Sequence, residues 1–137
     1  MIRRVIVDTG PLVAMLVARD RNHQWAKAVL AEIEPPLLTC EAVVSEACFL
    51  LAKHSGGHDA VLGLLARQIV VLDFELAPEL ERVRKLMQRY ASVPMSVADA
   101  CLVRMAETNA TSSILTLDGD FQIYRRNRRQ MLALISP

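Results

Sequence analysis

Short apolar runs alternate along the chain with longer stretches in which apolar residues recur at helical spacing. The apolar runs lie at 5–7, 37–39, 69–72 and 113–116, and a fifth candidate lies at 131–135. Brief continuous runs of Val, Ile and Leu are typical of strands that are buried on both faces of a parallel sheet. The pattern therefore predicts a parallel sheet of about four or five strands.

The stretches between these runs predict helices. Helices are expected from Pro11, at 22–33, after the strand at 37–39 and through about residue 51 or 53, at 59–66, at 77–90 and from Ser96. Pro11 suits a first helical position, and the prolines at 35, 36 and 94 favour helix ends just before them. Strands that alternate with helices indicate a three-layer α/β/α sandwich.

Length and composition indicate one soluble domain spanning residues 1–137, because 53% hydrophobic residues suffice for a full core. The longest apolar stretch, at 11–18, is well short of the roughly 20 residues that a membrane helix needs. The first residues contain no signal-peptide core, so we expect a cytoplasmic protein without membrane contact. Three cysteines without paired spacing, Cys40, Cys48 and Cys101, are interpreted as small buried residues.

Charge gives only a local hint of a nucleic-acid partner, because the net charge is +1. The candidates for RNA-phosphate binding are Arg125, Arg126, Arg128 and Arg129. A solvated charge run is the competing interpretation, and we favour it slightly. Trp25 is a candidate for base stacking, although an aromatic residue there is more often part of a core or a partner surface.

Acidic residues follow two of the predicted strands, where ligand sites of parallel α/β folds lie. Asp8 follows the first strand, and Asp118 follows the strand at 113–116. Both have structural alternatives. Asp8 or Thr9 could cap the next helix, and Asp118 is followed by glycine in an ordinary turn signal. Asp120 could likewise serve as a first-turn acid of a following helix.

Two further acids lie on predicted helices. Glu46 has apolar residues three and four positions away on both sides, which predicts an inward-facing carboxylate. Burial of that charge is costly unless a metal or an ion pair compensates it, and a position at the helix edge is the alternative. Asp99 lies three residues after Ser96, as in a capping box, but Leu102 and Val103 favour an inward orientation.

Together the four acids are expected to meet at one end of the sheet. Carboxylates gathered there repel one another unless a cation compensates them. Hard oxygen ligands without His or Cys favour Mg²⁺ or Mn²⁺, and the three histidines have no ligand spacing. Thr9 and Thr116 adjoin this site and could orient metal-bound water or a carboxylate.

Four motifs give the chain a resemblance to PIN-domain nucleases, and more narrowly to VapC-type toxins of toxin–antitoxin pairs. They are Val-Asp-Thr-Gly-Pro at 7–11, Val-Ser-Glu at 44–46, Ser-Val-Ala-Asp-Ala at 96–100 and Leu-Thr-Leu-Asp-Gly-Asp-Phe at 115–121. The resemblance covers nearly the whole chain. It implies an endoribonuclease that uses Mg²⁺ or Mn²⁺, is often a homodimer and is held inactive by a cognate antitoxin.

By this resemblance Asp8, Glu46, Asp99 and Asp118 match the acidic metal-binding positions, and Asp120 is a possible auxiliary residue. We assign the three aspartates to direct or water-mediated coordination, and Glu46 to coordination or to activation of the attacking water. The alternative is a catalytically silent PIN-like module that binds protein. An aspartic protease is excluded because such enzymes are β-rich and need two Asp-Thr-Gly loops, whereas this chain has one.

Overall fold

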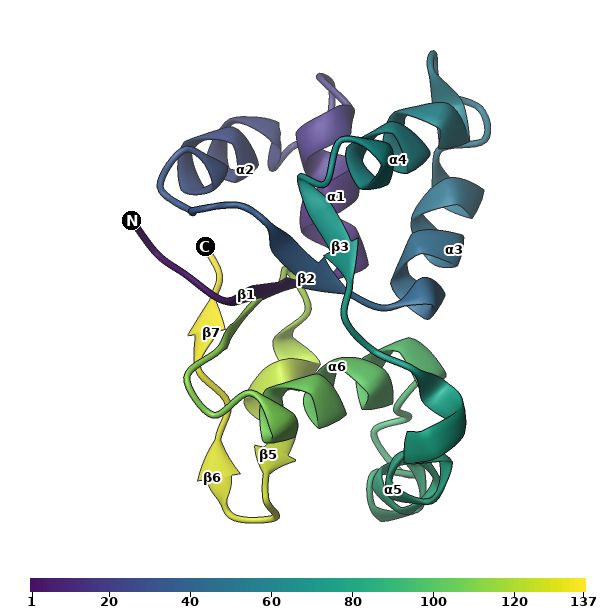
Figure 1. Ribbon diagram of the computed structural model, residues 1–137, viewed down its shortest axis with the longest axis vertical. Helices are drawn as coiled ribbons and strands as arrows, with labels where there is room; N and C mark the ends of the chain where they lie inside the picture. Colours follow the sequence, from purple (N-terminus) through teal and green to yellow (C-terminus); the bar gives the residue numbers. More distant parts are fainter.

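The computed structural model describes residues 1–137 and is built around a five-stranded parallel sheet (Figure 1). In chain order its strands are β1 (Val5–Val7), β2 (Leu37–Thr39), β3 (Val70–Leu72), β4 (Ser113–Leu115) and β7 (Leu134–Ile135). Their order in the sheet is β3-β2-β1-β4-β7, and every neighbouring pair is parallel. The first strand is therefore central, and its three residues are at most 1% exposed.

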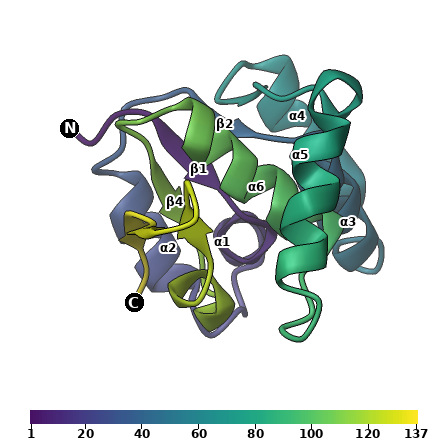
Figure 2. The same cartoon turned by 90° about the horizontal axis from the view of Figure 1, so that it is seen from below.

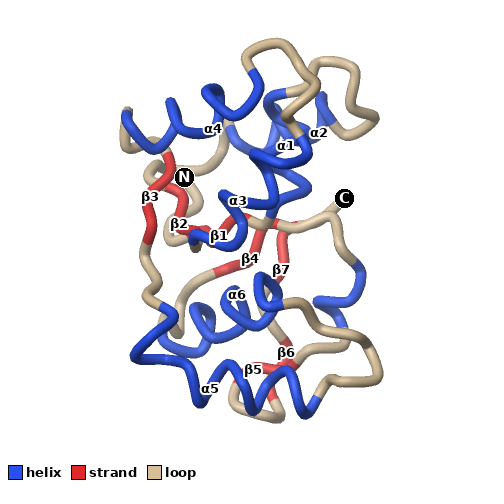
Figure 3. Tube along the Cα trace, turned by 90° about the vertical axis from the view of Figure 1, so that its right-hand side faces the viewer, coloured by secondary structure: helices blue, strands red, loops and turns tan.

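Helices cover both faces of this sheet. They are α1 (Thr9–Leu16), α2 (His23–Leu30), α3 (Glu41–Leu50), α4 (Gly57–Ala66), α5 (Leu76–Arg89) and α6 (Val97–Thr108), with a 3₁₀ helix, η1 (Gly119–Gln122). Figures 1 and 3 show α1 to α4 on one side of the sheet and α5 and α6 on the other. The predicted α/β/α sandwich is confirmed.

Element boundaries differ from the predicted ones chiefly at the C-terminal end. The apolar run at 131–135 does not form one strand. Residues Gln130–Met131 form β6, which pairs antiparallel with β5 (Arg125–Arg126), whereas β7 joins the main sheet. A five-residue run is thus divided between two sheets, with Leu132 buried between them at 7% exposure. At the other end, the helix predicted at 22–33 is shorter and ends at Leu30.

The hydrophobic core is densest around α6. Five of its residues, Ala100, Cys101, Leu102, Val103 and Met105, are at most 2% exposed. Cys40 is also buried, Cys48 is half-buried, and no cysteine forms a disulfide. Trp25 packs partly buried against the same core, in agreement with its structural interpretation. No helix has the length and apolar character needed to cross a bilayer.

Candidate active site

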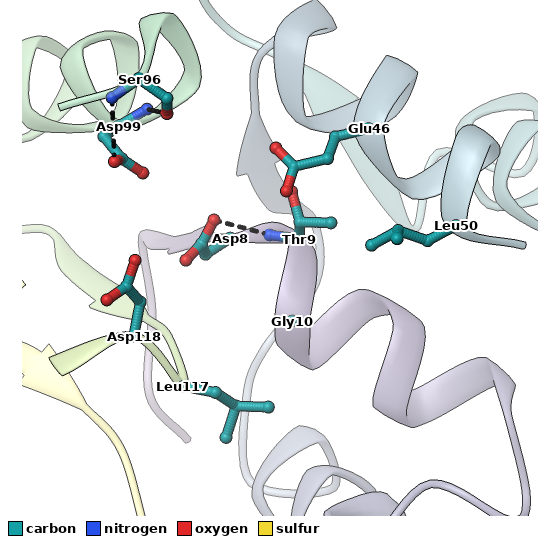
Figure 4. Close-up of a pocket in the computed structure, with 9 residues that line it drawn as sticks. All are labelled: Asp8, Thr9, Gly10, Glu46, Leu50, Ser96, Asp99, Leu117 and Asp118. Atoms are coloured by element: carbon teal, nitrogen blue, oxygen red, sulfur yellow. Dashed lines mark hydrogen bonds between the residues drawn. The ribbon is translucent and has the colours of Figure 1, made fainter. Parts of the chain in front are cut away.

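Four acids from separate parts of the chain line one open cleft of about 390 Å³ (Figure 4). Asp8 follows β1, Glu46 lies on α3, Asp99 lies in the first turn of α6 and Asp118 follows β4. The other lining residues are Thr9, Gly10, Leu50, Ser96 and Leu117. The four acidic side chains face a common space (Figure 4). Asp8 and Asp118 meet there because the carboxyl ends of β1 and β4 are adjacent.

Asp8 is the most buried acid of the cleft, with 8% of its surface exposed. Its Oδ1 accepts a hydrogen bond from the backbone N–H of Thr9 at 2.7 Å, and its Oδ2 accepts one from the hydroxyl of Thr116 at 2.7 Å. Burial raises the pKa of Asp8 to about 6, against the two hydrogen bonds, and the charges of Asp99 and Asp118 raise it further. Asp8 also caps α1, so both interpretations of this residue describe the same carboxylate.

Asp99 combines the capping role with a place in the cleft. Its backbone N–H donates to the hydroxyl of Ser96 at 3.0 Å, while its Oδ2 accepts from the N–H of Ser96 at 3.2 Å. The hydroxyl of Tyr124 donates to the same Oδ2 at 3.2 Å. Burial raises the pKa of Asp99, and the charge of Asp118 acts in the same direction. The capping box therefore holds this carboxylate at the rim of the cleft.

Asp118 is exposed and is held by the turn that it begins. Its Oδ1 accepts from the N–H of Asp120 at 2.9 Å, and its own N–H donates to the hydroxyl of Thr116 at 3.0 Å. Thr116 therefore connects Asp118 to Asp8 through one buried hydroxyl. Thr116 and Asp120 do not line the cleft themselves, and they act on it through these bonds.

Glu46 reaches the cleft from its solvent side, so the prediction of an inward-facing carboxylate is wrong. The side chain is exposed, and so are two of the apolar neighbours that suggested burial, Phe49 at 79% and Leu50 at 49%. The buried side of α3 carries Val43 and Ala47 instead. Glu46 takes part in none of the salt bridges, so its carboxylate is free to act within the cleft.

Two small residues shape the floor of the cleft. The hydroxyl of Thr9 is buried and has no hydrogen-bond partner, which is uncommon and costs free energy. Gly10 allows α1 to lie close to the loop that follows β4, since a Cβ at Gly10 would lie 3.2 Å from Cδ1 of Leu117. The cleft thus contains an unsatisfied polar group beside Asp8, whose pKa burial raises.

The donor set of this cleft fits a hydrated hard cation. All candidate ligands are oxygen atoms, as Mg²⁺ and Mn²⁺ prefer. No three of the acids lie close enough together to hold one ion directly. Mg²⁺ usually keeps several waters and is bound through one or two carboxylates, and the open cleft has room for such an arrangement.

The arginines of the C-terminal segment lie away from the acidic cleft. Nη1 of Arg125 donates to the carbonyls of η1 and its surroundings, at 2.6 Å for the closest, Gln122. Arg126 donates to the carbonyl of Ala110 at 2.7 Å and to the side chain of Gln130. These two guanidinium groups hold the hairpin, whereas Arg128 and Arg129 are exposed and none of the four lines the cleft.

Two residues that hold Asp99 differ in how visible they were in the sequence. Ser96 is recognisable from the Ser-x-x-Asp spacing. Tyr124 is not, because it lies in an arginine-rich segment without periodicity and is nevertheless fully buried. Its ring packs edge-on against Phe121 and Tyr90, which places its hydroxyl beside Asp99.

The parallel sheet with acids at the ends of β1 and β4 and on α3 and α6 defines a class of protein that comparison identifies. The PIN domain model matches residues 5–127, and the chain belongs to the PIN domain family. Over 118 residues the chain is 30% identical to Ribonuclease VapC26 of Mycobacterium tuberculosis, covering 83% of this chain and 86% of that protein.

A solved structure supports the same fold. The crystal structure of Mycobacterium tuberculosis VapC20, described as a sarcin-ricin loop cleaving toxin, superposes with a TM-score of 0.78. The two chains are 24% identical over 87% of this chain and 93% of that one. The resemblance to the PIN fold that the motifs suggested is confirmed.

Proposed function

We propose that the chain is a metal-dependent endoribonuclease that hydrolyses RNA phosphodiester bonds and serves as the toxin of a type II toxin–antitoxin pair. The observation that carries the proposal is the gathering of four carboxylates from four separate segments around one cleft. The name of the relative Ribonuclease VapC26 supports RNA as the substrate.

In this proposal Asp8, Asp99 and Asp118 hold Mg²⁺ or Mn²⁺ directly or through water. The cation, when bound, polarises the scissile phosphate, lowers the pKa of bound water and offsets the charge that develops during displacement. Glu46 is exposed at the cleft and unpaired, so it is suited to accept the proton of the attacking water. Thr116 keeps Asp8 oriented and favours its ionised form.

The likeness to VapC proteins also supports a proposal for how the enzyme is regulated and assembled. A cognate antitoxin would hold the enzyme inactive, and a homodimer is the proposed assembly. Both parts of this proposal rest on the family resemblance. Within the site itself, Thr9 and Asp120 are proposed auxiliary residues.

The experiment is an RNA cleavage assay with purified protein free of any antitoxin. Structured RNAs are incubated with Mg²⁺, Mn²⁺ or EDTA, using the unsubstituted chain, Asp8→Asn and Asp59→Asn. Asp59 is an exposed acid on α4 outside the cleft, so its variant is the matched control. We expect cleavage only with metal, a loss of about 100-fold or more in Asp8→Asn, and full activity in the control.

Three outcomes would overturn the proposal. Cleavage that persists in EDTA would show that the reaction does not need a metal ion. Cleavage that is equal in Asp8→Asn and Asp59→Asn would remove the acidic cleft from it. Retained fold with no cleavage by any of the three proteins would favour the silent protein-binding module.

A further inference from the structure

A second cleft, of about 320 Å³, lies between α5 and the turn of the β5–β6 hairpin. Three of its residues, Arg82, Lys85 and Arg89, come from α5, and Arg128 comes from the hairpin turn. The one acid that lines it is Glu107, near the end of α6. Figure 2 views the molecule from this side, with α5 and α6 next to each other. The cleft is therefore lined by four cations and a single anion.

The carboxylate of Glu107 already has partners within the protein, and it shares Arg104 with Glu79. Its carboxylate pairs with Nη1 of Arg104 at 3.3 Å and accepts the backbone N–H of Asn127 at 2.8 Å. In contrast, the four cations of the cleft take part in none of the salt bridges, and all four are exposed. The cleft consequently carries several uncompensated positive charges, which attract a polyanion.

The cations on α5 form a regular row. Lys85 and Arg89 follow Arg82 by three and seven residues, so the three side chains lie along one side of the helix over about 10 Å. An adjacent side of α5 is anchored in the core through Val83 and Leu86, and Leu86 also lines the cleft. A row of cations on a rigid helix suits the regularly spaced charges of a nucleic-acid backbone.

The row ends close to the acidic cleft. Tyr90 directly follows Arg89, and its ring lies 5.1 Å from that of Tyr124, whose hydroxyl donates to Asp99. Two tyrosine side chains thus separate the end of α5 from an acid of the first cleft. A polyanionic ligand long enough to contact the cations on α5 and the acidic cleft together would place part of its charged backbone on α5 and a backbone bond beside the acids.

We propose that the cleft between α5 and the β5–β6 turn binds the phosphate backbone of RNA that flanks the cleavage position. The inference rests on the proposed ribonuclease function of the acidic cleft. An acidic protein segment is a weaker fit, because such interfaces normally centre on an apolar anchor and the one apolar lining residue here, Leu86, is buried. Contacts to phosphates position RNA without reading its sequence.

The test compares two triple variants with the same change of charge. One carries Arg82→Gln, Lys85→Gln and Arg89→Gln. The control carries Arg19→Gln and Arg21→Gln in the α1–α2 connection and Lys27→Gln on α2, all at exposed residues. Figure 1 shows α1 and α2 on the opposite side of the sheet from α5. Affinity for a fluorescent RNA hairpin is measured by anisotropy in EDTA at several KCl concentrations, and thermal unfolding confirms that both variants are folded.

For the α5 variant we expect about a tenfold or greater loss of affinity at low salt. Log affinity decreases as log salt concentration increases, and the magnitude of this negative slope should be smaller by about 2, because three phosphate contacts are removed. The control should bind like the unsubstituted chain. With Mg²⁺ present, the α5 variant should show a higher KM for the hairpin and an unchanged kcat.

The proposal is overturned if both variants show the same affinity and the same salt slope, or if the unsubstituted chain does not bind RNA. Equal binding of polyglutamate to the unsubstituted chain and to the α5 variant, together with reduced RNA binding by that variant, supports RNA as the occupant. Loss of polyglutamate binding with RNA binding intact assigns the cleft to an acidic protein and overturns the proposal. Salt-dependent RNA binding through α5 without any cleavage would refute the nuclease function alone.

Discussion

Substitution of Asp8 by Asn should stabilise the metal-free protein at neutral pH. The carboxylate is 8% exposed, and burial raises its pKa to about 6. Asn has nearly the same shape, keeps one oxygen for the N–H of Thr9 and presents an amide to the hydroxyl of Thr116. The substitution therefore removes a charge that the fold disfavours and leaves most of its surroundings satisfied.

The size of this effect follows from the pKa of Asp8 in its two states. A solvated Asp has a pKa of 3.8, against about 6 in the folded protein. Between these values the folded protein binds more protons than the unfolded chain, so the free energy of unfolding falls as pH rises. The difference corresponds to about 3 kcal/mol above pH 6, since one pKa unit is about 1.4 kcal/mol. The raised pKa of Asp99 acts in the same direction.

Urea unfolding followed by circular dichroism in EDTA between pH 4 and pH 7 measures this effect. Curves for the unsubstituted chain and Asp8→Asn should nearly coincide at the low end, and the variant should be more stable by up to about 3 kcal/mol at pH 7. Added Mg²⁺ should stabilise the unsubstituted chain only and narrow the gap. Asp59→Asn serves as the exposed control. A variant that is less stable at pH 7, or a gap that does not grow with pH, would refute the reasoning.

Three further substitutions test how the cleft is held. Thr116→Val removes a hydrogen bond that lowers the pKa of Asp8, so the acidic limb of the pH–rate profile for RNA cleavage should move to higher pH; an unmoved limb would contradict the assignment. Ser96→Ala breaks the capping box of α6 and should lower the free energy of unfolding by about 1 kcal/mol in urea, whereas an unchanged midpoint would show that the cap contributes nothing. Gly10→Ala should displace the loop before η1 and reduce RNA cleavage about tenfold, whereas Gly63→Ala, which has open space around the new methyl, should retain full activity; equal rates would exclude that close approach as a requirement.

The sheet was predictable because each of its first four strands is a short apolar run bounded by residues that end it. β1 is the clearest example, since all three of its residues are buried and both of its neighbours in the sheet are parallel. The run at 131–135 misled because periodicity does not show that a chain leaves one sheet and joins another within five residues. That division depends on the β5–β6 hairpin, which is set by the backbone conformation of its turn.

Glu46 shows the limit of helical spacing as a guide to burial. Apolar residues around it predicted an inward carboxylate, but Phe49 and Leu50 are themselves exposed. Helical spacing identifies which residues share a side, and only packing decides whether that side is covered. Glu46 reaches the cleft because α3 begins just after β2, beside the edge where the strands end.

The basic residues show the same difference between sequence density and spatial arrangement. The dense arginine segment attracted attention, yet Arg125 and Arg126 bind carbonyl groups of the protein. The cations on α5 are spread over eight positions and only become a row when the helix forms. Spacing of three and four residues was the signal for the cations on α5, and Arg128 of the dense segment lines the same cleft.

The bond between Thr116 and Asp8 joins residues 108 positions apart, across two strands that are neighbours in the sheet. During synthesis the central strand therefore leaves the ribosome long before its partner exists, and the cleft stays incomplete until β4 emerges. A partly made chain has neither the strand that buries Asp8 nor Asp118 itself. The three strands β1, β2 and β3 can pair early, whereas the acidic cleft, and with it the proposed ribonuclease site, is completed only after residue 118 has been made.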